Sequence, residues 1–194
     1  MRRTIVLVCG AVSLASTISV ARAQLGATAT IASQQSSPGS YHYDITLNDT
    51  GSTSVGTFWF AWIAYPQEDL LPDSPTTVSS PPGWSYSITH VYNYYGYGPP
   101  DGYGIEWTSY AAPAMSGQSL TGFGFDSPDS PAQIAANSPY YSNTPANESV
   151  VYSGGPFSDG GFQLAATSAP VPEPSAAIAI LIPVAPWLIR RKRR

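Results

Sequence analysis

Lysine and arginine are absent from residues 24–189, and only 10% of the 194 residues are charged. All eight basic residues lie near the two ends of the chain, whereas all twelve acidic residues lie between Asp44 and Glu173. The body therefore carries twelve negative charges that no basic side chain balances. Such a body cannot hold a phosphate backbone through counterion release, which excludes nucleic acid as a direct partner.

Cysteine and histidine are nearly absent as well. The only cysteine, Cys9, lies in an apolar stretch near the N-terminus, so a chain processed beyond it has no thiol for disulfides or metal sites. The two histidines, His42 and His90, have no partner at a metal-binding spacing, and we expect both to be structural. No Gly-x-Ser-x-Gly elbow is present. The sequence thus predicts no catalytic residue, no cofactor and no enzymatic activity.

Acidic side chains are the remaining candidates for chemistry. A glycosidase needs two carboxylates across a cleft, and nothing in the sequence pairs the six that are available, which are Glu68, Asp69, Asp73, Glu106, Asp126 and Asp129. Asp126 with Asp129, or Glu68 and Asp69 with Asp73, could offer oxygen ligands to calcium. Neither group matches a calcium-loop signature, and solvated acidic turns are the plainer interpretation.

The N-terminus has the pattern of a secretory signal peptide. A short basic start at Arg2 and Arg3 is followed by an apolar stretch over residues 5–20 and by the small residues Ala21 and Ala23. This pattern predicts a signal peptide over residues 1–23, cut by signal peptidase before Gln24. An uncleaved anchor is the alternative, but the apolar stretch is short for a membrane span.

The C-terminus combines a motif, an apolar segment and a basic cluster. Pro172-Glu173-Pro174 precedes fifteen mostly apolar residues, 175–189, and these precede five cations, which are Arg190, Arg191, Lys192, Arg193 and Arg194. As a helix the apolar segment spans about 22 Å, short of a hydrocarbon core of about 30 Å. The cations are expected to stay in the cytoplasm as a membrane stop, which leaves the body outside. A plain, weak membrane anchor is the simplest interpretation of these residues.

These three elements, in this order at the end of the chain, resemble the PEP-CTERM sorting signal of bacterial exported proteins. The resemblance covers residues 172–194 and implies recognition by an exosortase-type membrane transpeptidase that cuts near Pro172-Glu173-Pro174. It also implies transient anchoring in the inner membrane, followed by a place at the cell surface or in the exopolysaccharide matrix. It implies nothing about what the body does there.

The body, residues 24–165, is predicted to be one all-β domain. Apolar and polar residues alternate in several short segments, for example 41–47, 84–88, 103–107, 123–125 and 162–164. The chain also contains 17 glycines and 19 prolines, which favour many turns. We expect an antiparallel β-sandwich of immunoglobulin-like type. A turn or two of helix near residues 131–137 and a linker over residues 166–171 complete the expected organisation.

Residues 55–65 differ because both faces of the expected strand are apolar. Phe58, Phe60 and Trp62 are predicted on one face, and Trp59 on the other. Such a strand is usually central, with one face in the core and the other under a loop. Residues 66–82 are the expected cover, and an exposed aromatic patch for a partner is the alternative.

Tyr94, Tyr95 and Tyr97 lie among glycines and prolines in an expected loop, and Tyr140 and Tyr141 lie in another. Sugar rings stack on aromatic rings, so these tyrosines are candidates for contact with exopolysaccharide. A loop folded onto its own domain is the simpler interpretation. The sequence favours an exported, non-enzymatic surface or matrix protein, and an extracellular carbohydrate-binding module is the alternative.

Overall fold

The structure, a computed structural model, describes residues 23–63, 68–69, 71–91, 102–109, 111–135 and 146–169. Of this part, 56% is strand and 4% is helix, which confirms the prediction of an all-β body. The expected signal-peptide helix and membrane helix both lie outside the described residues.

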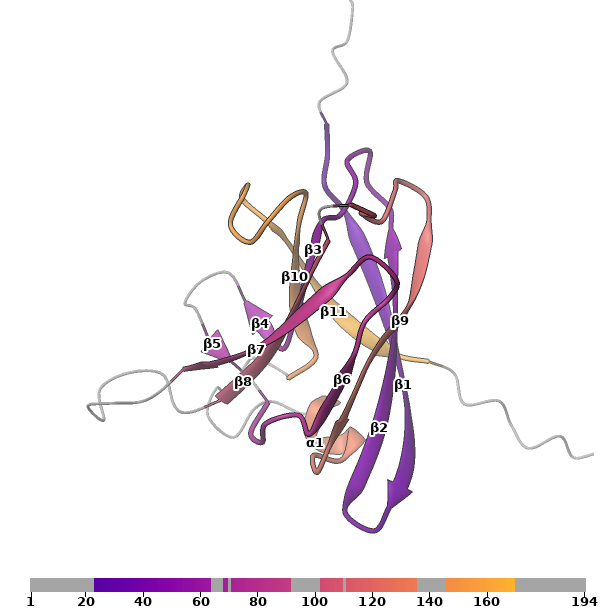
Figure 1. Cartoon of the computed structure of the whole chain (residues 1–194), viewed down its shortest axis with the longest axis vertical. Coiled ribbons are helices and arrows are strands. Elements are labelled where there is room, and N and C mark those ends of the chain that lie inside the picture. Colours follow the sequence, from indigo (N-terminus) through magenta and orange to yellow (C-terminus); the bar gives the residue numbers. More distant parts are fainter. Residues whose placement is uncertain are drawn as a thin grey trace, which may run out of the picture.

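The described residues form eleven strands and one short helix, which follow one another along the chain (Figure 1). Their bounds are β1 (Ala27–Ser37), β2 (Ser40–Asp49), β3 (Thr57–Phe60), β4 (Trp62–Ile63), β5 (Glu68–Asp69), β6 (Thr77–Ser79), β7 (Ser85–Val91), β8 (Gly102–Thr108), β9 (Ser119–Ser127), α1 (Pro131–Ala135), β10 (Glu148–Tyr152) and β11 (Phe162–Ser168).

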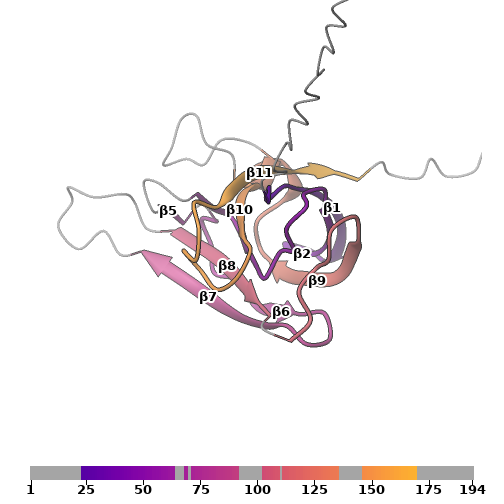
Figure 2. The ribbon, with the colours of Figure 1, turned by 90° about the horizontal axis from the view of Figure 1, so that it is seen from above.

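Nine strands form a single sheet in the order β6-β9-β2-β1-β11-β10-β3-β8-β7. The sheet curls until it is nearly closed, with β6 and β7 as its two edges (Figure 2). It is mixed rather than wholly antiparallel, because β1 and β11 pair in parallel, with Ile31 opposite Ser168. β11 is antiparallel to β10 and fills the place between β10 and β1, where its direction matches that of β1.

The core lies between the two halves of this curled sheet. Phe58 of β3 meets Phe123 of β9 edge to face at 5.5 Å, and Phe60 of β3 meets Phe125 of β9 at 5.3 Å. All four rings are at most 1% exposed. The alternation predicted for residues 123–125 is therefore confirmed, and so is the central position of β3, which pairs with both β10 and β8.

Burial stops at the edge strand β7. Trp84, just before β7, is buried, and its Nε1 donates to the carbonyl oxygen of Ala112 at 2.9 Å. Tyr86 and Ile88 continue the same alternation but are 49% and 39% exposed. They lie opposite the buried Trp107 and Ile105 of β8 in register, but β7 is the last strand of the sheet.

The predicted alternation over residues 55–65 is wrong after Phe60. Ala61 has a φ of 57°, in the left-handed region, and ends the extended conformation of β3. Trp62 consequently lies on the face of Trp59 rather than with Phe58 and Phe60, and the two indoles stack at 4.2 Å and 9°. The side chains of both tryptophans are buried, so they form no exposed patch.

The last strand continues past the expected end of the body. β11 runs to Ser168, and the amide of Ala169 donates to the carbonyl oxygen of Ile31 at 2.8 Å. Residues 166–168 of the expected linker thus belong to the sheet. The helix α1 lies within the predicted segment 131–137, and Ser130 and Gln133 cap its start through reciprocal hydrogen bonds.

Candidate functional site

A group of polar side chains lies where β2, β9 and β6 run side by side. His42 of β2 is directly opposite Asp126 of β9, and His42 Nδ1 is 2.7 Å from Asp126 Oδ1. His42 Nε2 is 3.4 Å from Asp44 Oδ1, and the hydroxyl of Thr77 donates to the other oxygen of Asp126. Three strands, two of which hold residues more than eighty positions apart, therefore build one polar cluster, which we call the His42 cluster (His42, Asp44, Thr77, Asp126).

The charges in the His42 cluster stabilise one another. The hydrogen bond to Asp126 raises the pKa of His42, and the hydrogen bonds from Thr77 and His42 lower the pKa of Asp126. Both ring nitrogens face carboxylates, so neither is placed to take a proton from a nucleophilic hydroxyl. The geometry is that of a surface ion pair.

Asp129, a few residues further along, is almost fully buried beneath this face. It is 1% exposed, and its Oδ2 accepts from the hydroxyl of Ser127 at 3.2 Å and from the amide of Asp73 at 3.4 Å. Its Oδ1 is buried and has no hydrogen-bond partner in the described part of the chain. Burial raises the pKa of Asp129, and the neighbouring charge of Asp73 adds to the increase.

We expect Asp129→Asn to raise the melting temperature at pH 7. The folded pKa of Asp129 is raised above the unfolded value of 3.8, so its ionisation destabilises the fold as pH rises past that value. The amide of asparagine keeps an acceptor for Ser127 but carries no charge. The gain over wild type should shrink as pH falls toward and below 3.8, because the Asp129 carboxyl then becomes protonated in both the folded and the unfolded chain.

Asp126→Asn is the matched control, and its sign is opposite. The pKa of Asp126 is lowered in the fold, so its carboxylate stabilises the fold above its unfolded pKa. Its replacement should lower the melting temperature at pH 7. Thermal unfolding between pH 3.5 and 7.5 measures both effects; an Asp129→Asn protein that is less stable than wild type at pH 7 would contradict the burial argument.

The other acidic candidates do not join this group. Glu106 lies in β8, opposite Trp59 in the other half of the sheet, where burial raises its pKa. Glu68 and Asp69 form β5, which pairs with β4. Of the candidate calcium ligands, Asp73 contacts Asp129, through its backbone amide. Among the described residues, no group of three or more histidine, cysteine or acidic side chains could hold a metal ion.

The outer face of β3 and β10 carries a second hydrophobic cluster, made of Trp59, Trp62, Val150 and Tyr152. Phe157, from the loop between β10 and β11, lies over it, with its ring 5.6 Å from that of Trp59. Phe157 has a φ of 58°, an unfavourable conformation for a bulky residue, and it is 51% exposed. The Phe157 loop therefore covers part of this face, and the predicted cover, residues 66–82, lies partly outside the described residues.

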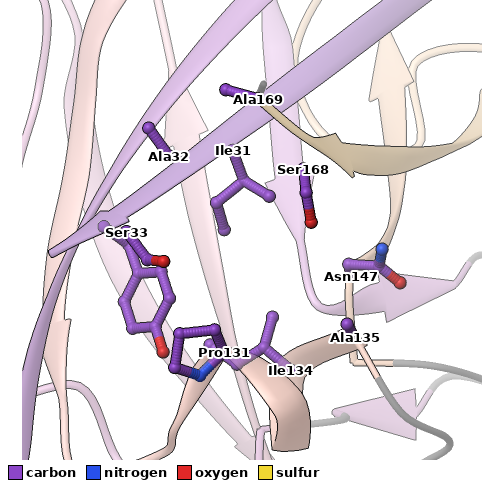
Figure 3. Close-up of a pocket in the computed structure, with 10 residues that line it drawn as sticks. Ile31, Ala32, Ser33, Pro131, Ile134, Ala135, Asn147, Ser168 and Ala169 are labelled. Carbon is purple, nitrogen blue, oxygen red and sulfur yellow. The ribbon is translucent and has the colours of Figure 1, made fainter. Parts of the chain in front are cut away.

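A pocket of about 340 Å³ opens where β1, β11 and α1 meet (Figure 3). Ile31 and Ser33 of β1 and Ile134 of α1 point into it, and Ser168 and Ala169 form its rim. Tyr43 of β2 also lines it. Most of the lining surface is apolar. Sequence reasoning missed this pocket, because its walls come from segments more than a hundred residues apart that only the parallel pair β1–β11 brings together.

The remaining predicted site residues lie largely outside the described part of the chain. These are Ala21, the tyrosines at 94, 95, 97, 140 and 141, the motif at 172–174 and the cations at 190–194. Ala23 and Gln24 are described and exposed, and the amide of Gln24 donates to the Ser52 hydroxyl at 2.9 Å. No helix within the described ranges is long and apolar enough to cross a membrane. No protein-family model, curated protein or solved structure matches the chain.

Proposed function

We propose that this protein is an exported, non-enzymatic component of the cell surface or extracellular matrix, sorted through its C-terminal tail. One observation carries the proposal: Pro172-Glu173-Pro174, a short apolar segment and five terminal cations follow one another in a chain that has no other cation after Arg22. Signal peptidase and an exosortase-type membrane transpeptidase are the partners that this tail and the N-terminal signal require. The tail is held in the membrane transiently, with the body outside.

The polar chemistry of the body supports a non-catalytic role. Both ring nitrogens of His42 contact carboxylates, and Asp129 is buried. Within this proposal the body is an immunoglobulin-like sandwich module, a class common in exported surface proteins. The two facing halves of the curled sheet, in contact through Phe58 and Phe123, support that assignment.

The mass and location of the mature protein in its native host test the proposal. We expect a chain that begins at Gln24 and is shortened near Pro172-Glu173-Pro174, in the surface or matrix fraction. A Glu173→Ala protein should remain full length at its C-terminus and stay in the membrane. A wild-type protein found in the cytoplasm with residues 1–23 intact would contradict the proposal.

Contact with exopolysaccharide is a second function that we propose, because the hairpin β7–β8 presents the tyrosine-rich segment. The last pair of this hairpin is Val91 and Gly102, and next to it the ring of His90 stacks on that of Tyr103 at 4.2 Å. The segment with Tyr94, Tyr95 and Tyr97 therefore starts and ends at a fixed pair of strands. Tyr86, on the same hairpin, adds an exposed ring.

Affinity electrophoresis in gels that contain the host's exopolysaccharide measures this contact. We expect wild type to be retarded and the triple variant Tyr94→Ala, Tyr95→Ala, Tyr97→Ala to lose about tenfold or more in affinity, since each stacked ring contributes on the order of 1 kcal/mol. Phe157→Ala, which removes an exposed ring elsewhere on the body, should bind like wild type. Equal migration of wild type with and without the polymer would contradict this function.

A further inference from the structure

One edge of β1 is paired over only part of its length. β2 pairs with β1 from Ala27 to Ser37, whereas the β11 register on the other edge ends at Ile31 opposite Ser168. Beyond Ile31 the side chains of β1 are exposed up to Ser37, and no described residue pairs with this edge. An unpaired strand edge with free backbone groups is a template for another strand.

The apolar pocket lies beside this edge, where the described chain leaves the body. Ile31 and Ser33 line the pocket from β1, and Ser168 and Ala169 line it from the end of β11 (Figure 3). The next residues of the chain, Pro170-Val171-Pro172-Glu173-Pro174, therefore begin at the rim of the pocket. They include the whole sorting motif.

The spacing of the three prolines matches the hydrogen-bond pattern of β11. In a strand, successive amides face opposite neighbours. The amide of Ala169 donates to Ile31 of β1, whereas the amide of Ala166 donates to Asn147, just before β10. Continued in register, odd-numbered residues would turn their amides toward β1 and even-numbered residues away from it. Proline, which has no amide hydrogen, stands only at the even positions 170, 172 and 174.

We propose that the free edge of β1 and its pocket are a docking surface for the protein's own segment 170–174, which extends β11. Val171 then donates to the carbonyl oxygen of Ser33, and Glu173 donates to that of Gln35. This proposal rests on the function proposed above only where it calls residues 172–174 a sorting motif. The contact itself is argued from the edge of β1, the pocket and the spacing of the prolines.

The same register places the proline rings over the pocket. Ile31 is opposite Ser168, so Ser33 is opposite Pro170 and Gln35 is opposite Pro172, on the face of β1 from which Ile31 enters the pocket. Apolar rings suit this mostly apolar pocket, and an outer edge without amide hydrogens resists pairing with a further strand. Glu173 falls on the opposite face. The sorting enzyme thus meets its motif against the body, with the carboxylate turned away from the pocket.

A disulfide trap in the full chain tests the docking. Cys9→Ser removes the only native cysteine, and Ser33→Cys with Pro170→Cys places two thiols on directly opposite positions. Neighbouring strands lie about 4.8 Å apart, within the range of Cα separations that a disulfide bridges. Mild oxidation should consume both thiols within one chain. Ser33→Cys with Val171→Cys, which lie on opposite faces in this register, should keep both thiols free.

Hydrogen exchange supplies a second measurement. In residues 170–174 only Val171 and Glu173 carry an amide hydrogen, and both should be protected in the full chain. One alanine inserted after Ala169 brings prolines to the positions that face β1, so protection should be lost; two inserted alanines restore the spacing and should restore it. The docking would be overturned if the thiols at positions 33 and 170 stay free, or if the amides of Val171 and Glu173 are unprotected. It would also be overturned by a disulfide-linked dimer, which would assign the edge of β1 to a second copy of the chain. Normal cutting of such a chain would leave the proposed sorting intact.

Discussion

Replacing Trp107 by alanine is expected to lower the free energy of unfolding by about 3–5 kcal/mol. Trp107 is fully buried in β8, stacked on Phe58 at 5.6 Å and edge to face with Phe123 at 5.3 Å. Its Nε1 also donates to the carbonyl oxygen of Ser79 at 2.8 Å. That bond joins β8, the neighbour of the edge strand β7, to the other edge strand, β6, so the substitution removes core volume and a link across the open seam of the sheet.

Thermal unfolding followed by circular dichroism measures the loss. A change of this size should lower the melting temperature by roughly 10–20 °C for a body of this length. Tyr86→Ala is the matched control, because Tyr86 lies directly opposite Trp107 on β7 but is 49% exposed. Its loss should cost less than about 1 kcal/mol. Equal shifts for the two variants would show that Trp107 is not in the core.

The contrast between these two residues shows what alternation can predict. A period of two placed Trp107 and Tyr86 on matching faces of neighbouring strands, and both are there. The pattern does not say which strand has a neighbour in front of it, because that depends on the order of strands in the whole sheet. Burial at β8 and exposure at β7 follow from the order β3-β8-β7, with β7 as the last strand.

The error at Trp62 has a different cause. A single left-handed residue, Ala61, reverses the alternation, and alanine gives no signal for such a conformation, unlike glycine or asparagine. The structure places Trp62 against Trp59 and keeps Ala61 itself fully buried. The left-handed conformation of Ala61, which alanine does not favour, thus occurs together with the stacking of the Trp59 and Trp62 indoles.

The candidate site was predictable only as a set of residues. The sequence singles out Asp73, Asp126 and Asp129 as acidic candidates and predicts a structural role for His42. Their grouping depends on the register of β2 against β9 and on the loop before β6. These segments are separated by tens of residues. The parallel contact of β1 with β11, which creates the pocket, has no local signal at all, since it joins the first strand of the chain to the last.

The largest effects on location are expected from two changes in the tail. Glu173→Ala should leave an uncut precursor held in the membrane, because it removes a residue of the motif but keeps the apolar segment and the cations. Deletion of residues 190–194 should instead release an uncut protein, because the membrane stop is lost. Each cation costs roughly 2.5–3.5 kcal/mol to move into the hydrocarbon, so five of them hold the end on the cytoplasmic side.

Two control variants distinguish the specific effects of the motif and of the positive charge from a general effect of changing residues in the tail. Ser175→Ala, next to the motif, should be cut like wild type, and replacement of the four terminal arginines by lysine should keep the membrane stop, since the charge is unchanged. Mass spectrometry and membrane fractionation in the native host distinguish cut, anchored and released chains. The apolar segment is short and contains Pro183 and Pro186, which weaken a permanent helix and favour a temporary stop. If wild type and Glu173→Ala give the same full-length membrane species, the tail is an anchor and the proposed sorting is wrong.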